Sequence, residues 1–214
     1  MVPSTERTPP SGTDATYPST SSPAAPASSF RALAGGLTPI DGASASRYLA
    51  GAYHGLTGSA PSTATLDLLW AQWALETSRG QAMYGNNFGG IKAGAQGPSA
   101  LLSTTEGYGA NARRVRDRFR TYATPEEGAR DYVSLLARRY PQAFEALRRG
   151  DADGFAAGLH HGRYFTANPE TYRTALHRLS AEHRLGPSSA PPPGPLERLG
   201  LDGVRWALEK ARDD

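Results

Sequence analysis

Apolar residues recur every three or four positions in several stretches of the chain. The segment 46–56 places Tyr48, Leu49, Ala52, Tyr53 and Leu56 at helical spacing. The strongest stretch lies within 61–78, where LDLLWAQWALE is apolar at nearly every position and Pro61 and Ser62 provide a start signal. A helix that is apolar nearly all round is typical of the centre of a core. We therefore predict two packed helices, of which the second is central.

Three further helical segments and a short one are predicted in the second half of the chain. Thr124 to Glu127 forms a capping box with proline at the first helical position, which launches a helix with Tyr132, Val133 and Leu136 inward. A short helix is expected over 142–149, and Asp151 should cap the next one, with Phe155, Ala156 and Leu159 buried. Asn168 and Pro169 start the last core helix, which spaces Tyr172, Ala175, Leu176 and Leu179 regularly.

Between the two groups of helices the hydrophobic period changes to nearly two. The segments 101–105 and 114–121 are predicted to be short strands joined through EGYGAN. Val115 and Phe119 fall on one face of the second strand, and Arg116, Arg118 and Arg120 on the other. The pattern predicts a mainly α (α+β) domain with a small β-hairpin lobe.

The ends of the chain have a different composition. Residues 1–29 are rich in Pro, Ser, Thr and Ala, which predicts a disordered tail, whereas 30–185 is globular in composition. Residues 186–195 (GPSSAPPPGP) form a Pro-rich linker, and 196–214 can form a short C-terminal helix with Leu199, Val204 and Leu208. The start of the chain has no apolar run, so we expect neither a secretory signal nor membrane insertion.

The charge of the chain and the spacing of its histidines limit the partners and metals that it can bind. The 214 residues carry a net charge of +3 and no cysteine, and nearly all the basic residues are arginines. These arginines can attract an anionic polymer, but no nucleic-acid-binding motif accompanies them, so no nucleic-acid partner is predicted. His160 and His161 are adjacent and diverge on a helix, and no HExxH spacing occurs. We predict no metal and no cofactor.

Glu76 is the first candidate for catalysis. Helical spacing places Leu69, Gln72 and Trp73 on its face, so the acid lies over two large apolar side chains and one amide. A carboxyl group in such surroundings should keep its proton more readily than in water, because burial disfavours the charged form. That property suits a general acid. The alternative is a surface Glu near the end of a helix.

A series of short motifs follows Glu76. Gly80 is expected to stop the helix in the left-handed conformation, and NNFGG at 86–90 to turn the chain tightly. The segment NNFGG is preceded by ALETSRG and followed by STTEGY, FRTY, DY and GRYFTANPETY. With these motifs in this order, the chain resembles the glucosaminidases of glycoside hydrolase family 73. These are bacterial peptidoglycan hydrolases, with flagellar-rod and autolysin members. The chain departs from the family pattern at the positions of Ser78, Arg79, Gly89, Arg163 and Phe165.

The resemblance implies a lysozyme-like, two-lobed domain that cleaves the β-1,4 bond after N-acetylglucosamine in the peptidoglycan glycan strand. Glu76 would be the acid, and Glu106 the second carboxylate, acting as a base or as a stabiliser of positive charge. Asn87, Tyr132 and Tyr164 would be substrate-binding. Read from their surroundings alone, Glu106 can equally be a solvated turn residue, and both tyrosines can be core residues.

The sequence is also compatible with other functions. A muramidase or a lytic transglycosylase would share Glu76 without needing Glu106, and a non-catalytic wall-binding or assembly protein would need neither. The family resemblance predicts action in the periplasm or cell wall. Because no signal segment is evident, we expect specialised export machinery, or delivery as an antibacterial toxin with an immunity protein as partner.

Overall fold

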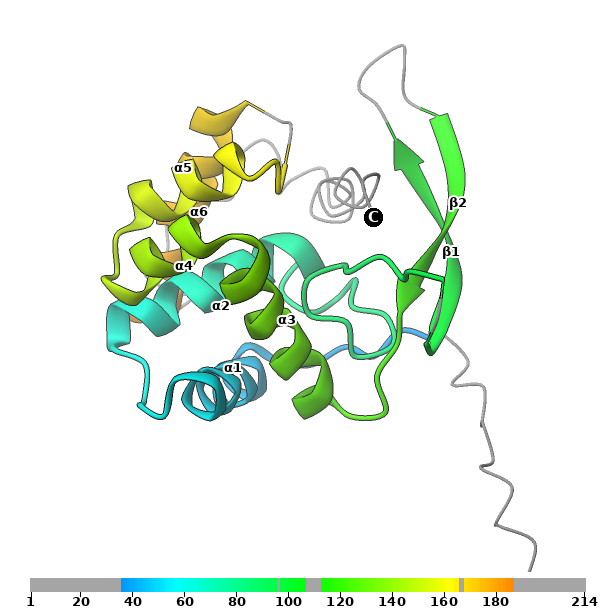
Figure 1. Ribbon diagram of the computed structural model, residues 1–214, viewed down its shortest axis with the longest axis horizontal. Coiled ribbons are helices and arrows are strands. Elements are labelled where there is room, and N and C mark those ends of the chain that lie inside the picture. Colours follow the sequence, from blue (N-terminus) through cyan, green and yellow to red (C-terminus); the bar gives the residue numbers. More distant parts are fainter. Residues whose placement is uncertain (1–35, 96, 107–112, 166–167, 187–214) are drawn as a thin grey trace, which may run out of the picture. The chain divides into compact units, whose positions relative to one another are not determined.

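The computed structural model describes residues 36–95, 97–106, 113–165 and 168–186 (Figure 1). The predicted tail 1–29 and helix 196–214 lie outside these residues, as does the linker beyond Gly186. In the described part, the elements are α1 (Gly42–Thr57), α2 (Thr63–Thr77), β1 (Ser99–Glu106), β2 (Arg113–Arg120), α3 (Pro125–Arg139), α4 (Pro141–Arg148), α5 (Ala152–His161) and α6 (Pro169–Leu185). The prediction of a mainly α domain with a small β hairpin is confirmed.

Helices α2, α3, α5 and α6 begin where the sequence signals them. The side chains of Ser62, Thr124, Asp151 and Asn168 each accept a hydrogen bond from a backbone N–H in the first turn of α2, α3, α5 and α6. Helix α1 begins four residues before the predicted Ser46, because Asp41 accepts from the Ser44 N–H at 2.8 Å and caps it. Local side-chain chemistry therefore accounts for these helix starts.

The end of α2 differs from the prediction. Ser78, and not Gly80, is the residue that caps the helix in the left-handed conformation, with φ 50°. Arg79 (φ 55°) and Gly80 (φ 84°) continue in the same region of backbone space. Gly80 is still required, because a Cβ there would lie 2.3 Å from the carbonyl oxygen of Ile40. The tight turn therefore begins two residues earlier, directly after Glu76 and Thr77.

Helix α2 lies at the centre of the core, as predicted. Nearly every residue from Thr65 to Thr77 is buried, and α2 packs against α1 and α6. The buried side chains of α1, α3, α5 and α6 include every position that the sequence predicted to face inward, except Leu56, which is 44% exposed, and Tyr48, which is partly buried. No described helix is long and apolar enough to cross a membrane.

The hairpin is attached to the helical part through the loop that follows α2. Strands β1 and β2 pair antiparallel, with Ser99 opposite Arg120 and Glu106 opposite Arg113. On the other edge of β2, the Ala93 N–H donates to the Arg118 carbonyl at 2.8 Å, and the Arg120 N–H to that of Ile91 at 2.9 Å. Phe119 is buried, whereas Arg116 and Arg118 are exposed, as the alternation predicted.

Candidate active site

Glu76 lies in the last turn of α2 and is 3% exposed, which confirms the expected burial. Leu69, Gln72 and Trp73, which precede it on the same helix, are completely buried. The left-handed turn at Ser78 and Arg79 then carries the chain sharply away. The carboxyl group is thus held by the most buried helix of the described residues, directly beside a change in chain direction.

Two tyrosines from other helices approach Glu76. The Tyr132 hydroxyl of α3 donates to Gln72 Oε1 at 2.5 Å, one turn before Glu76. Burial raises the pKa of Tyr132, and the charges of Tyr172 and Glu76 raise it further. Burial also raises the pKa of Tyr172 on α6, again with a contribution from Glu76. Both side chains therefore remain neutral phenols, and the carboxyl group lies in a cluster of helices α2, α3 and α6.

Asn87 joins the loop after α2 to the hairpin. Its Nδ2 donates to the carbonyl oxygens of Ile91 and Arg120 at 2.9 and 3.0 Å, and its Oδ1 accepts from the Ile91 N–H at 2.9 Å. The next residue, Phe88, packs against Trp73 of α2 with ring centroids 6.3 Å apart. This pair of residues fixes β2 relative to the helix that carries Glu76.

Two ion pairs hold the base of the hairpin. Lys92 Nζ lies 2.6 Å from Asp117 Oδ2 on β2. Asp131 of α3 accepts from Arg120 Nη1 at 2.9 Å and from the Tyr122 hydroxyl at 2.6 Å. Burial raises the pKa of Tyr122, and the Asp131 carboxylate raises it further, so the phenol stays a hydrogen-bond donor. The hairpin is thereby anchored on both the loop after α2 and on α3.

Glu106 is the last residue of β1, opposite Arg113 of β2. The connecting residues 107–112 lie outside the described ranges. The sequence placed Glu106 in the connection EGYGAN, whereas the structure extends β1 by one residue to include it. Its catalytic role stays a prediction, as do the roles of Glu76, Asn87, Tyr132 and Tyr164.

Tyr164 follows α5 and is completely buried. Its ring packs edge-on against Tyr140, with centroids 5.3 Å apart. Its neighbour Phe165 stacks on Tyr172 at 3.9 Å and 12°. The segment before α6 therefore reaches the neighbourhood of Glu76 through Tyr172, a residue whose helical spacing had indicated only a core position.

Two departures from the family pattern have partners that the sequence did not indicate. Arg79 makes a two-point ion pair with Glu182 of α6, with Nε and Nη2 at 2.6 and 2.5 Å from the two carboxylate oxygens. A Cβ at Gly89 would lie 2.5 Å from Tyr132 Cδ2, so the ring of Tyr132 occupies that space. No short sequence pattern could indicate either contact, because Arg79 and Glu182 are 103 positions apart in the sequence and Gly89 and Tyr132 are 43 positions apart.

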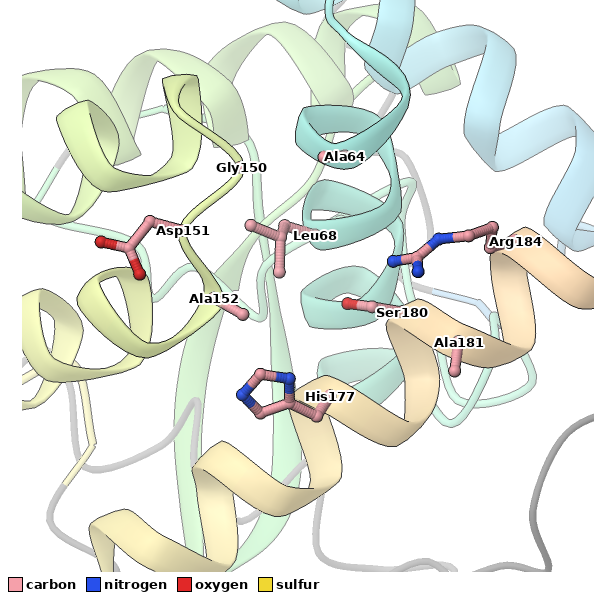
Figure 2. Close-up of a pocket in the computed structure, with 9 residues that line it drawn as sticks. All are labelled: Ala64, Leu68, Gly150, Asp151, Ala152, His177, Ser180, Ala181 and Arg184. Atoms are coloured by element: carbon pink, nitrogen blue, oxygen red, sulfur yellow. The ribbon is translucent and has the colours of Figure 1, made fainter.

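A pocket of about 470 Å³ lies elsewhere, near the start of α2 (Figure 2). Ala64 and Leu68 of α2 line it together with Gly150, Asp151 and Ala152 and with His177, Ser180, Ala181 and Arg184 of α6. Leu68 precedes Glu76 by eight residues, about 12 Å along a helix. This pocket is therefore separate from the candidate active site.

Comparison with known protein families places this domain in a class. Residues 62–185, from the cap of α2 to the end of α6, match the glucosaminidase family, described as mannosyl-glycoprotein endo-beta-N-acetylglucosaminidase. The chain belongs to this family of glycoside hydrolases.

Its relatives include peptidoglycan hydrolase FlgJ of Escherichia coli K12, which is 34% identical over 135 residues, or 57% of this chain and 42% of FlgJ. FlgJ of Salmonella typhimurium is 32% identical over 105 residues, or 48% of this chain and 32% of FlgJ. The solved glycoside hydrolase domain of that protein aligns with 25% identity and a TM-score of 0.48, over 70% of this chain and 92% of the domain. The matched region spans less than half the length of either FlgJ.

Proposed function

We propose that this protein is a peptidoglycan hydrolase of the endo-β-N-acetylglucosaminidase type, which cleaves the β-1,4 bond after N-acetylglucosamine. The observation that carries this proposal is the buried Glu76 within the segment 62–185, which matches the glucosaminidase family. The FlgJ relatives, named as peptidoglycan hydrolases, support the bacterial cell wall as the substrate.

Glu76 acts as the general acid. Its carboxyl group donates a proton to the leaving glycosidic oxygen as positive charge develops on the sugar ring. Leu69 and Trp73 share its face of α2, the neutral phenols of Tyr132 and Tyr172 lie near it, and the residue is 3% exposed. Burial disfavours the charged form of a carboxyl group, which is the direction that general-acid catalysis at neutral pH requires.

Glu106 supplies the second carboxylate. It either activates the attacking water or stabilises the oxocarbenium-like transition state. The anchors at Lys92, Asn87 and Asp131 support this role, because they fix the hairpin of Glu106 to the loop and helix next to Glu76. The distance between the two carboxyl groups in the substrate complex decides between direct inversion and assistance by the acetamido group of the substrate.

Asn87, Tyr132 and Tyr164 line the substrate groove or support its walls. Asn87 uses its side chain to shape the backbone at Ile91 and Arg120. Tyr132 orients Gln72 beside Glu76. Tyr164 supports the segment that leads to Tyr172. We assign these three residues to binding and positioning, and not to proton transfer.

The site of action that follows is the periplasm or the cell wall. Dedicated export, or delivery as a toxin that is countered by an immunity protein, would bring the enzyme to its substrate. Tagging the protein in its own cells and fractionating them would test the location. Recovery of active protein only from the cytosol would contradict it.

The product identifies the bond that is cut. Digestion of purified sacculi followed by borohydride reduction should convert terminal N-acetylglucosamine into its alditol, detected by mass spectrometry. A muramidase would instead yield a reduced muramic sugar, and a lytic transglycosylase an anhydromuramic end that resists reduction. Muramic-type ends alone would overturn the proposed bond, and no released sugar at any pH would identify a non-catalytic wall-binding protein.

A further inference from the structure

Three helices meet at a hydrogen-bonded Ser, His and Asp, outside the proposed glucosaminidase site. Ser46 of α1 has its Oγ 2.6 Å from His183 Nε2 of α6. On the other side of the ring, His183 Nδ1 lies 2.7 Å from Asp67 Oδ1 of α2. Both distances are within hydrogen-bond reach, so the three side chains form one continuous chain of contacts.

The chemistry of Asp67 determines which nitrogen of His183 carries the proton. An ionised carboxylate only accepts hydrogen bonds, so Nδ1–H donates to Asp67. In the neutral imidazole, Nε2 is then the acceptor and receives the hydrogen bond of the Ser46 hydroxyl. This is the order of roles in a nucleophile, its base and the carboxylate that orients the base.

The carboxylate and the ring are both held in place. Asp67 is 1% exposed, and its second oxygen accepts from Arg184 Nε at 2.9 Å. Figure 2 shows Arg184 projecting from α6 toward α2. The ring of His183 stacks on Trp70, with centroids 5.0 Å apart and planes at 28°. These contacts hold the His183 ring between Asp67 and Ser46, whereas Ser46 and His183 stay partly exposed.

This triad is remote from Glu76, although Asp67 and Glu76 lie on the same helix. Nine residues separate them, which corresponds to about 14 Å along the axis and about half a turn in direction. Asp67 therefore points away from the direction of Glu76, and its own partners are His183 and Arg184 near the end of α6. A reaction at Ser46 would not compete with one at Glu76.

We propose that Ser46 is a nucleophile activated by His183 and Asp67, which takes small acyl groups, such as acetyl, from esters. The Ser46 oxygen bonds to the acyl carbon while its proton moves to His183 Nε2. The alcohol leaves with that proton, which gives an acyl-serine. Water, activated by the same imidazole, then releases the acid and restores the serine. The partial burial of Ser46 limits the acyl group to a small one.

The position of Ser46 inside a helix determines the expected kinetics. In serine proteases of the chymotrypsin type, the backbone N–H of the nucleophile donates a hydrogen bond to the developing oxyanion. The N–H of Ser46 is instead used in the hydrogen bonding of α1, so it does not donate to an oxyanion. Acylation should therefore be slow, and deacylation slower. Covalent labelling of Ser46 is accordingly a more sensitive measurement than turnover.

The test uses the full chain with p-nitrophenyl acetate and, separately, with a fluorophosphonate, followed by peptide mass mapping. Ser44 is the matched control, because it lies in the same helix and binds Asp41, not a histidine. We expect Ser46 to be modified about a hundredfold faster than Ser44, the lower end of general-base effects. Ser46→Ala and His183→Gln should abolish the modification, and Ser44→Ala should keep it.

A second pair of variants covers the case in which His183→Gln does not fold. Ser46→Cys should react with iodoacetamide at least about tenfold faster than Ser44→Cys, because a neighbouring imidazole promotes the reactive thiolate. Equal rates in this pair, or equal labelling of Ser46 and Ser44, would overturn the proposal. The three side chains would then only join α1, α2 and α6.

Discussion

Helix α2 carries two buried carboxyl groups, Asp67 and Glu76, whose neighbours differ in kind. Asp67, near its start, accepts hydrogen bonds from His183 and Arg184, two side chains that carry or can carry positive charge. Glu76, in its last turn, lies among apolar side chains and near the phenols of Tyr132 and Tyr172. One helix thus presents one carboxylate held by two basic side chains and one carboxyl group close to two phenols. The partners, and not the helix, assign the two roles.

Removing the transferable proton should have the largest effect of any change on α2. Glu76→Gln keeps the shape of the side chain, and we expect glucosaminidase activity to fall about a hundredfold to ten-thousandfold. Release of sugar from sacculi measures the loss, and thermal melting measures the fold. Activity within a few-fold of the unmodified enzyme, with normal melting, would dismiss Glu76 as the acid.

A change at Glu106, the proposed second carboxylate, compares the role of the hairpin with that of the buried Glu76. If the acetamido group of the substrate takes part, Glu106→Gln should lower activity about a hundredfold, which is the lower end of the range for acid–base catalysis. This loss would be smaller than that of Glu76→Gln. The same sacculus assay checks this. An unchanged rate would move the second role to Asp117 or Asp131, whose replacement by Asn would then be measured.

Asp67 should show the reverse pattern to Glu76. Asp67→Asn weakens the charge-assisted hydrogen bonds to His183 and Arg184, each worth about 1.5–3 kcal/mol. We expect a loss of about 2–3 kcal/mol in the free energy of unfolding, measured with denaturant. Glucosaminidase turnover of the folded fraction should stay nearly unchanged. A loss of turnover without a loss of stability would contradict the prediction that Asp67 stabilises the fold and takes no part in glucosaminidase catalysis.

The smallest effect is expected outside the helical core. Deleting residues 1–29 should leave the melting temperature and the hydrolysis of soluble wall fragments nearly unchanged, because this segment has little apolar content to add to a core. A clear drop in melting temperature would mean that the segment packs on the domain and that the proposed boundary is wrong.

Much of this architecture could be predicted from the amino-acid sequence. The caps at Ser62, Thr124 and Asp151 act within one turn of their helices, so their residue types are sufficient to place the helix starts. The apolar surface of α2 predicts that it is central, and therefore that Glu76 is buried. The alternation at Phe119 likewise predicts the buried face of β2.

Local pattern was not sufficient at the end of α2. Gly80 is the residue best suited to a left-handed cap, yet Ser78 and Arg79 adopt that conformation before it. The two-point ion pair of Arg79 joins it to Glu182, 103 positions away in the sequence, and accompanies this conformation. A choice between neighbouring cap residues depends on such distant partners, because their intrinsic preferences differ by only about 1–2 kcal/mol.

The sequence by itself therefore determined the helices, the hairpin, the central place of α2 and the burial of Glu76, because these follow from local patterns of residues. Only the tertiary structure decided what surrounds each charged group. Tyr172 beside Glu76, and Ser46 and His183 around Asp67, come from helices that are distant in the sequence. The physical reason is that burial follows from periodicity, whereas the partner of a buried group follows from how helices pack.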